Sequence, residues 1–157
     1  MKGICGFCGH RDAPSSIRSA LESAIERYIV SGQVDTFYVG NQGAYDRIVT
    51  GILQKLKKKY ADIQYYVVLA YLPGKKRAYA DEIPTILPEG IELVPSQFAI
   101  ARRNRWMVDQ VKYMIAYVTR DMGGAAQTLA YAQRKGVIVV NLGREGPQRA
   151  SLPGKGV

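Results

Sequence analysis

The feature that most constrains the fold is a regular alternation of short apolar runs with longer stretches of helical periodicity. The apolar runs, typical of strands buried on both faces, lie at residues 3–8, 34–39, 64–72, 113–118 and 137–142. Between them apolar side chains recur as in amphipathic helices, at residues 17–29, 45–56, 96–110 and 125–135. Strands that alternate with helices pair in parallel through right-handed crossovers. The chain is therefore predicted to be an α/β protein, a three-layer sandwich with a mostly parallel central sheet of about five strands.

Turn residues set the predicted ends of several elements. Asp12 is the predicted N-cap of the first helix, with Pro14 in its first turn and Gly32 as its stop. Pro and Gly punctuate the least regular part of the chain, in which one short strand is predicted at residues 91–94. A chain of 157 residues suits one domain. We therefore predict a domain at residues 1–143 and a basic, Gly- and Pro-containing C-terminal tail at residues 144–157.

Charge and composition narrow the class of protein. The 22 Lys and Arg residues outnumber the 13 Asp and Glu residues, which gives a net charge of +9. With 47% hydrophobic residues, the body of the chain is too apolar for disorder. No apolar stretch approaches the roughly 18 residues of a membrane helix, and the first residues lack the pattern of a secretory leader. We expect a cytoplasmic protein that has no membrane partner.

Three predicted strands run into glycine-containing turns that open a helix, at residues 6–11, 40–43 and 123–124. The carboxyl ends of parallel strands share one edge of the sheet, where ligands bind. Glycine suits such a turn either because it lets an anion approach the N–H groups of the helix N-terminus or because it supplies a positive φ. Three turns at equivalent positions favour a phosphate site. None spells a Walker loop or a complete G-x-G-x-x-G motif, which argues against the common triphosphatases and dehydrogenases.

Four segments occur in an order that indicates a family. They are Gly-His-Arg after the first strand, Gly-Asn-Gln-Gly-Ala-Tyr-Asp after the second, Ala-Arg-Arg-Asn-Arg-Trp-Met-Val-Asp before the fourth, and Gly-Gly-Ala after it. Across residues 3–142 the chain resembles the SLOG superfamily, which includes the DNA-processing protein A domain and the lonely-guy hydrolases. It looks closest to the YpsA-like branch of uncharacterised proteins. The resemblance implies a Rossmann-like fold, of bacterial or phage origin, that binds nucleotides or NAD-derived signals such as ADP-ribose.

The resemblance and the glycine turns together predict one ligand site at the carboxyl edge of the sheet. Its predicted residues are Gly9, His10, Arg11, Gly40, Asn41, Gly43, Asp46, Arg103, Gly123, Gly124 and Ala125. We expect a protein that binds a nucleotide or nucleotide-derived small molecule, as a sensor or sequestering protein and without turnover. We expect no resident cofactor, and a homodimer or higher homo-oligomer because self-association is common in relatives.

The enzymatic alternative is N-glycosidic hydrolysis of a nucleotide, as in the lonely-guy phosphoribohydrolases. That resemblance implies an arginine on the helix before the fourth strand, where Arg103 stands, and a glutamate after the motif P-G-G-x-G-T. Here Met122 replaces the proline and Ala130 stands at the glutamate position. A carboxylate is needed beside an oxocarbenium-like transition state. Asp46 is the alternative source of one, although no spacing requires it, so catalytic residues stay unassigned.

Several predicted site residues have a structural alternative. His10 either faces the ligand or makes a structural hydrogen bond. Arg11 either binds phosphate oxygens with its planar fork, or it caps a neighbouring helix or pairs with Asp12 or Asp46. Asp46 either contacts a ribose or stabilises the first turn of its own helix.

Cys5, Cys8 and His10 form the only cluster with metal-ligating potential. A structural zinc site takes four ligands, and the chain has no third Cys and no second His. We therefore predict no metal site and expect both cysteines to be reduced, small apolar core residues.

Ten basic residues form three clusters that are typical of a nucleic-acid surface: Lys55, Lys57, Lys58 and Lys59; Lys75, Lys76 and Arg77; and Arg102, Arg103 and Arg105. Single-stranded DNA binding is accordingly the second alternative function. The first cluster has a simpler explanation. It lies at the C-terminal end of a predicted helix, where the helix dipole stabilises cations without any partner.

Overall fold

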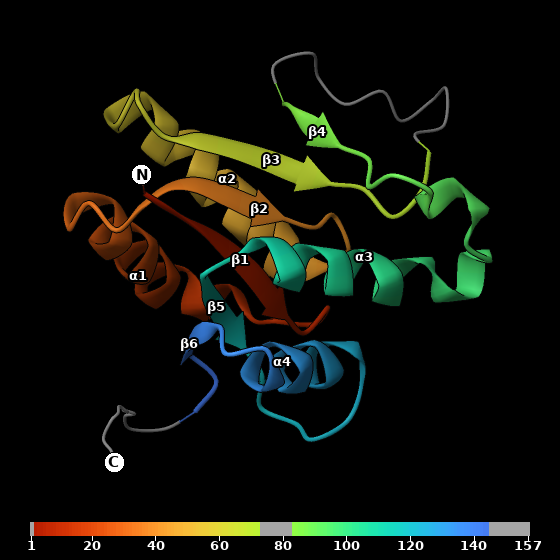
Figure 1. Cartoon of the computed structure of the whole chain (residues 1–157). Coiled ribbons are helices and arrows are strands. Elements are labelled where there is room, and N and C mark those ends of the chain that lie inside the picture. The colour runs from red at the N-terminus through yellow and green to blue at the C-terminus, as the bar shows by residue number, and fades with distance from the viewer. Residues whose placement is uncertain (1, 73–82, 145–157) are drawn as a thin grey trace.

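The computed structural model describes residues 2–72 and 83–144, which form a single six-stranded sheet with helices on both faces (Figure 1). The strands are β1 (Gly3–Gly9), β2 (Val34–Val39), β3 (Gln64–Val68), β4 (Thr85–Ile86), β5 (Tyr113–Tyr117) and β6 (Ile138–Asn141). They lie in the order β4-β3-β2-β1-β5-β6, and every neighbouring pair is parallel. The predicted α/β sandwich with a parallel sheet is confirmed.

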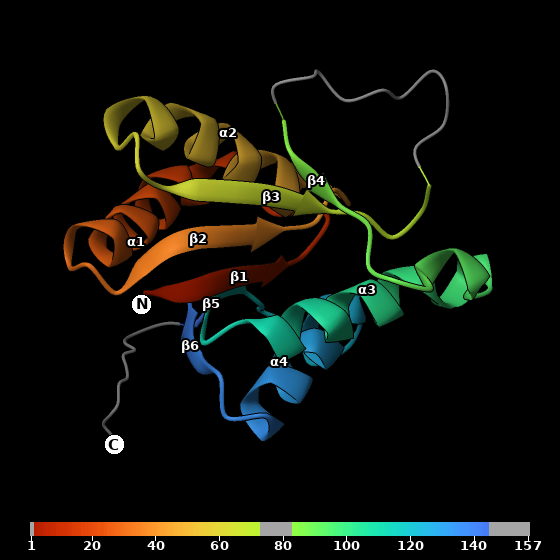
Figure 2. The same ribbon diagram turned by 45° about the horizontal axis from the view of Figure 1, so that its top comes forward.

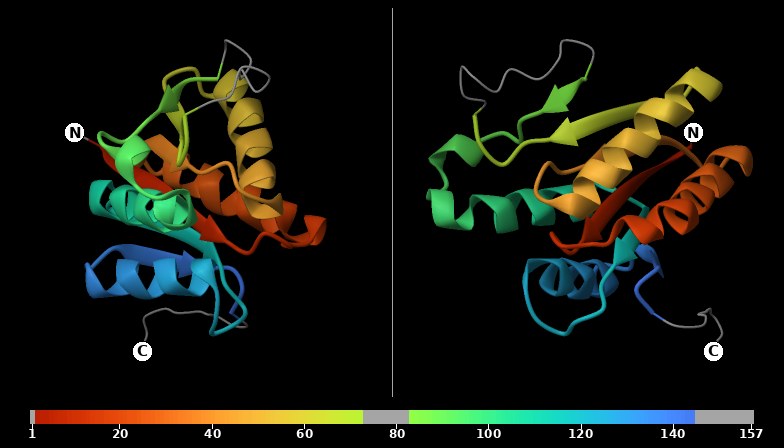
Figure 3. Two further views of the ribbon diagram at one scale, coloured as in Figure 1. Left: turned by 90° about the vertical axis from the view of Figure 1, so that its right-hand side faces the viewer. Right: turned by 180° about the vertical axis from the view of Figure 1, so that it is seen from behind.

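Two helices cover each face of the sheet (Figure 2). On one face, α1 (Arg18–Val30) and α2 (Ala44–Lys59) pack over a core that includes Phe7, Phe37 and Ile115. On the other, α3 (Ser96–Gln110) and α4 (Gly124–Arg134) enclose a smaller core around Met114 and Ala116. Figure 3 shows the three layers from the side and from behind.

Strand β5, which lies between β1 and β6, shows why the strand segments of the sequence are continuously apolar. Tyr113 and Ile115 belong to the core beneath α1 and α2, whereas Met114 and Ala116 belong to the core beneath α3 and α4. Successive side chains of a strand point to opposite faces, and here both faces are covered. All four side chains are buried, so no polar alternation is expected.

The irregular connection before α3 differs from the prediction. Residues 91–94, predicted as a strand, instead contain a 3-10 helix, η3 (Ile91–Leu93), followed by Val94. The N–H groups of Leu93 and Val94 donate to the carbonyls of Gly90 and Ile91, which are local turn bonds rather than ladder bonds. The sixth strand is β4 instead, a two-residue edge strand paired with β3. Strand β3 also ends at Val68, earlier than the predicted residue 72.

The start of the first helix is a second correction. A 3-10 turn, η1 (Ser15–Ile17), precedes α1, and no side chain caps either element. Pro14 precedes η1 rather than lying inside the first turn of the helix. Asp12, the predicted N-cap, forms an ion pair with Arg120 instead.

No helix among the described residues is long and apolar enough to cross a membrane. The predicted tail beyond Arg144 and the basic cluster at residues 75–77 lie outside the described residues.

Candidate ligand pocket

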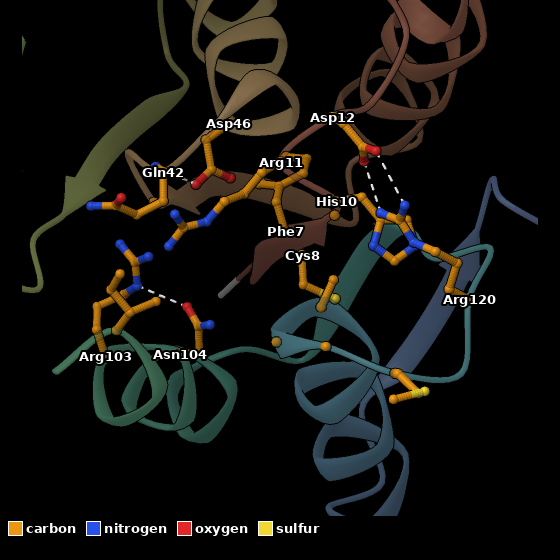
Figure 4. Close-up of a pocket in the computed structure, with 17 residues that line it drawn as sticks. Phe7, Cys8, His10, Arg11, Asp12, Gln42, Asp46, Arg103, Asn104 and Arg120 are labelled. Atoms are coloured by element: carbon orange, nitrogen blue, oxygen red, sulfur yellow. Dashed lines mark hydrogen bonds and ion pairs between the residues drawn. The ribbon is translucent and has the colours of Figure 1, made fainter. Parts of the chain in front are cut away.

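A pocket of about 800 Å³ opens at the carboxyl edge of the sheet, outside the ends of β1, β2 and β5 (Figure 4). The chain passes from β1 to β2 on one side, and β5 adjoins β1 on the other side, so the strand order reverses there. This is the position at which ligands bind in open parallel sheets. All three predicted glycine turns contribute residues to the pocket.

Nine of the eleven predicted site residues line the pocket: Gly9, His10, Arg11, Gly40, Asp46, Arg103, Gly123, Gly124 and Ala125. Asn41 and Gly43 do not line it. Gly43 has a φ of +92°, and a Cβ there would approach Arg11 Cα to 2.6 Å. Its missing side chain therefore allows two loops to pack closely, and its role toward a ligand stays a prediction.

The N-terminus of α2 is closed by the chain itself. The N–H of Gln42 donates to Oδ2 of Asp46 over 2.8 Å, and the N–H of Ala44 donates to the carbonyl of Arg11 over 2.8 Å. These bonds occupy two of the N–H donors at this helix end, so fewer donors remain for an anion. Two donors of the second glycine turn are therefore engaged by the chain itself, and the role of this turn as a phosphate cradle stays a prediction.

Asp46 and Arg103 fill the space that Gly40 leaves. A Cβ on Gly40 would lie 2.7 Å from Nη1 of Arg103 and 2.8 Å from Oδ2 of Asp46. Arg103 is 2% exposed, and its Nη1 donates to the carbonyl of Val68 over 2.7 Å. Burial raises the pKa of Asp46, while the positive charge of Arg103 and the Gln42 hydrogen bond oppose that rise. The two side chains give the floor of the pocket a compensated pair of charges.

At Gly9 the absence of a side chain also allows close packing, here of the Tyr45 ring. A Cβ on Gly9 would overlap the ring of Tyr45, which is fully buried. The Tyr45 hydroxyl donates to the carbonyl of Ile115 over 2.7 Å, across the sheet. The ring therefore sits on the end of β1, and Gly9 makes room for it while still lining the pocket.

The N-terminus of α4 is open, in contrast to that of α2. Gly123 precedes the helix with a φ of +98°, and a Cβ on Gly123 or Gly124 would meet no atom within 4 Å. Among the described residues, no acceptor contacts the N–H groups of Gly124, Ala125 and Ala126. The first hydrogen bond of the helix runs from Gln127 to Gly123 over 3.0 Å. Bare amides at the positive end of a helix, inside a pocket, form a site for an anion.

His10 makes a structural hydrogen bond. Its Nε2 accepts from the N–H of Thr119 over 2.9 Å, and the side chain is 5% exposed. Burial lowers the pKa of His10, and the nearby charge of Arg120 lowers it further. An acceptor nitrogen with a lowered pKa indicates a neutral imidazole. His10 thus joins the loop after β1 to the loop after β5, beside the pocket.

Arg11 extends into the pocket on the same side as Arg103 (Figure 4). In the part of the chain that the structure describes, its guanidinium forms no ion pair or hydrogen bond, although its charge acts on Asp46. Neither Asp12 nor Asp46 is its ion-pair partner. An exposed guanidinium without a partner suits recognition of phosphate oxygens.

Eight pocket residues escape the sequence prediction: Phe7, Cys8, Asp12, Gln42, Ile100, Asn104, Arg120 and Met122. Phe7, Cys8 and Gln42 belong to the predicted turns. Asp12 and Met122 adjoin those turns and Asn104 follows Arg103, so closeness in the sequence could have indicated them. Arg120 had no such signal, because its partner Asp12 lies 108 residues earlier in the chain.

The two cysteines cannot act together. Cys5 lies in the core beneath α1 and α2, whereas Cys8 lies in the core beneath α3 and α4. Residues three apart on a strand point to opposite faces. Burial raises the pKa of both thiols, that of Cys8 to about 12. Among the described residues, no group of three or more His, Cys, Asp or Glu side chains could hold a metal ion.

Comparison with known proteins supports the fold. No family model and no curated protein sequence matches the chain. Among solved structures, the chain is similar to the X-ray structure of DNA processing protein A (DprA) from Streptococcus pneumoniae, with a TM-score of 0.65 and 13% sequence identity. The match covers 89% of this chain and 50% of that one, so the chain spans half the length of DprA. The Rossmann-like fold is therefore shared with DprA.

Proposed function

We propose that the protein binds a phosphorylated, nucleotide-derived small molecule, with a phosphate on the N–H groups at the start of α4. The observation that carries the proposal is that the N–H groups of Gly124 and Ala125 have no acceptor among residues 2–72 and 83–144, and that they share a pocket with the Arg11 guanidinium, which has no partner in those ranges. A charge-assisted bond from a guanidinium is about twice as strong as a neutral one. The assignment to the SLOG superfamily and its YpsA-like branch belongs to this proposal, as do the cytoplasmic location and the self-association.

We propose binding without turnover. Ala130 stands on α4 where the lonely-guy glutamate is expected, and it does not line the pocket. Asp46 is 8% exposed and accepts the Gln42 N–H, so its carboxylate is committed to the turn before α2. A general acid or nucleophile for glycosidic cleavage must reach the scissile bond. The role we infer is sensing or sequestering the ligand.

The test is calorimetry and thermal unfolding with AMP, NAD and ADP-ribose. We expect a raised Tm, as binding to the folded state requires, and recovery of the intact compound. Arg11→Gln should weaken binding by roughly ten-fold, the effect of losing about 1.4 kcal/mol. Arg47→Gln is the matched control, because it removes the same charge from an exposed position on α2 outside the pocket. Release of free base at a catalytic rate would contradict the proposal, as would equal effects of the two variants.

A second candidate function is single-stranded nucleic-acid binding on a different surface. Tyr38 stacks on Trp106 with ring centroids 5.9 Å apart, and Tyr38 also meets Tyr66 edge-on at 6.0 Å. All three rings are partly exposed, and the exposed Arg102 lies one turn before Trp106 on α3. Rings beside positive charge are the features on which unpaired bases stack. The structural similarity to a DNA processing protein is compatible with this candidate.

Trp106 is the single tryptophan, so its fluorescence reports on this surface directly. We expect an oligothymidylate to quench it, with an affinity that falls steeply as salt rises. Tyr66→Ser should weaken the binding, whereas Tyr28→Ser, which alters a ring on α1 at the other face of the sheet, should not. Absence of salt-sensitive binding at low ionic strength would remove this candidate.

A further inference from the structure

An ion pair between Arg120 and Asp12 forms part of the pocket wall. Nη2 of Arg120 lies 2.8 Å from Oδ1 of Asp12, and Nη1 lies 3.1 Å from Oδ2, so the carboxylate occupies both prongs of the guanidinium. Both residues line the pocket. The pair joins the loop after β1 to the loop after β5.

A ligand anion can replace the Asp12 carboxylate on Arg120 at little cost in stability. The side chains of Arg120 and Asp12 are 54% and 70% exposed. Exposed ion pairs contribute little to stability, so breaking this one costs the fold little. The bidentate geometry that holds a carboxylate also holds a phosphate, which carries more charge and more acceptor oxygens. A ligand anion therefore competes with Asp12 for Arg120 on favourable terms.

Two further basic side chains, Arg11 and Arg103, line the opposite side of the pocket. Figure 4 shows Arg11 and Arg103 at one side and the Asp12–Arg120 pair at the other. A ligand with one phosphate can satisfy the α4 amides and Arg11 without disturbing the pair. A ligand with a second phosphate group can in addition displace the carboxylate from Arg120.

We propose that Asp12 is a built-in anion that occupies Arg120 until the second anionic group of a ligand replaces it. The pocket thereby selects ligands with two anionic groups over singly phosphorylated ones. This inference rests on the proposed function of the same pocket. It assigns Arg120 as a specificity-determining residue and Asp12 as its competitor.

The test is a double-mutant cycle with two probes, AMP and ADP-ribose, measured by calorimetry at fixed ionic strength. Wild-type protein should bind ADP-ribose more tightly than AMP. Asp12→Asn should raise the affinity for ADP-ribose by roughly five-fold, a typical coupling between competing partners, and change that for AMP by less than about two-fold. Arg120→Gln should remove the preference for ADP-ribose. In the double variant the gain from Asp12→Asn should vanish, because it acts through Arg120.

Glu22→Gln is the matched control. It breaks the exposed Lys55–Glu22 ion pair between α1 and α2, outside the pocket, with the same change of net charge. A gain from Asp12→Asn that persists without Arg120, or that is equal for AMP and ADP-ribose, would overturn the inference while leaving the proposed function intact. If neither probe binds to any of these proteins, the proposed function fails as well.

Discussion

The N-termini of α2 and α4 lie at the same edge of the sheet, and both follow a glycine with a positive φ, +92° at Gly43 and +98° at Gly123. Around α2 the chain supplies its own acceptors, the Asp46 carboxylate and the Arg11 carbonyl. At α4 the described chain supplies none, and the space beside Gly123 is open. The same local turn is therefore engaged by the chain at α2 and left open by the described chain at α4.

The difference shows that neighbouring side chains and carbonyls decide whether the N–H groups after a glycine turn stay open to a ligand. Both helices carry partial positive charge at the N-terminal end, which attracts an anion by a similar free energy in each. Among the described residues only the α4 end lacks an acceptor from the chain, although Gln42 and Asp46 at the α2 end line the same pocket. The following predictions test this division between a closed, structural end and an open, binding end.

The largest effect is expected at the closed side. Gly9→Ala would place a methyl group in the ring of the buried Tyr45. Overpacking of this kind costs about 3 kcal/mol of unfolding free energy, at the upper end of its usual range. Urea denaturation measures it. Gly136→Ala is not a suitable comparison because of its positive φ, so Gly51→Ala, which meets nothing closer than 3.6 Å, is the control. A loss below about 1 kcal/mol would contradict the packing role.

Asp46→Ala should come next in size. It removes the acceptor of the Gln42 N–H and the carboxylate beside the buried Arg103. Leaving a buried donor without its acceptor costs about 1–3 kcal/mol, and we expect the upper part of that range because the partner charge stays buried. Asp62→Ala removes an exposed carboxylate and should change the unfolding free energy little. Equal effects of the two variants would show that the α2 end does not depend on its internal acceptor.

The His10–Thr119 hydrogen bond, which joins the loop after β1 to the loop after β5, should make the stability of the protein depend on pH. The pKa of His10 lies below its ordinary value of 6.5 in the folded state, so the unfolded chain binds more protons as pH falls. Stability from His10 is therefore present above that value and lost below it. We expect Tm to fall between about pH 7.5 and 5.5. The fall should be smaller in His10→Gln, whose amide oxygen can accept the Thr119 N–H.

Asp46 acts in the opposite direction, since its folded pKa is raised. Comparing the wild-type and His10→Gln curves isolates the contribution of His10. Parallel curves for the two proteins would contradict the neutral imidazole.

The smallest effect on stability is expected at the open side. Gly124→Ala adds a methyl group that meets no atom within 4 Å. Because Ala favours a helix over Gly by up to about 1 kcal/mol, the unfolding free energy should stay unchanged or rise slightly. AMP binding should nevertheless weaken by roughly ten-fold, because the methyl group crowds an anion near the amide. Retained affinity would place the phosphate elsewhere, and a large loss of stability would show that the turn is not open.

Much of the fold follows from the sequence, because buried parallel strands and amphipathic helices have distinct periodicities. Five strands and four helices lie where the apolar patterns place them. The pattern fails at β4, since two residues carry no period, and at η3, where the buried Ile91 resembles a strand residue. It also fails at Asp12, whose partner is chosen by the fold rather than by sequence neighbours.

The candidate site is predictable as a location but not in its details. Parallel topology alone brings the three glycine turns to one pocket. Sequence cannot say that Tyr45 takes the space beside Gly9, or that the Arg11 carbonyl takes the Ala44 N–H. These are contacts between residues far apart in the chain, and they decide which turn stays open.

The most direct test follows the backbone amides during titration with AMP, by two-dimensional NMR of the ¹⁵N-labelled protein. We expect the signals of Gly124 and Ala125 to shift in a saturable way, while those of Gln42 and Ala44 stay in place because their N–H groups already have acceptors. Saturable shifts at Gln42 and Ala44, with none at Gly124 and Ala125, would assign the anion to the α2 end and contradict the division proposed between the two helix N-termini.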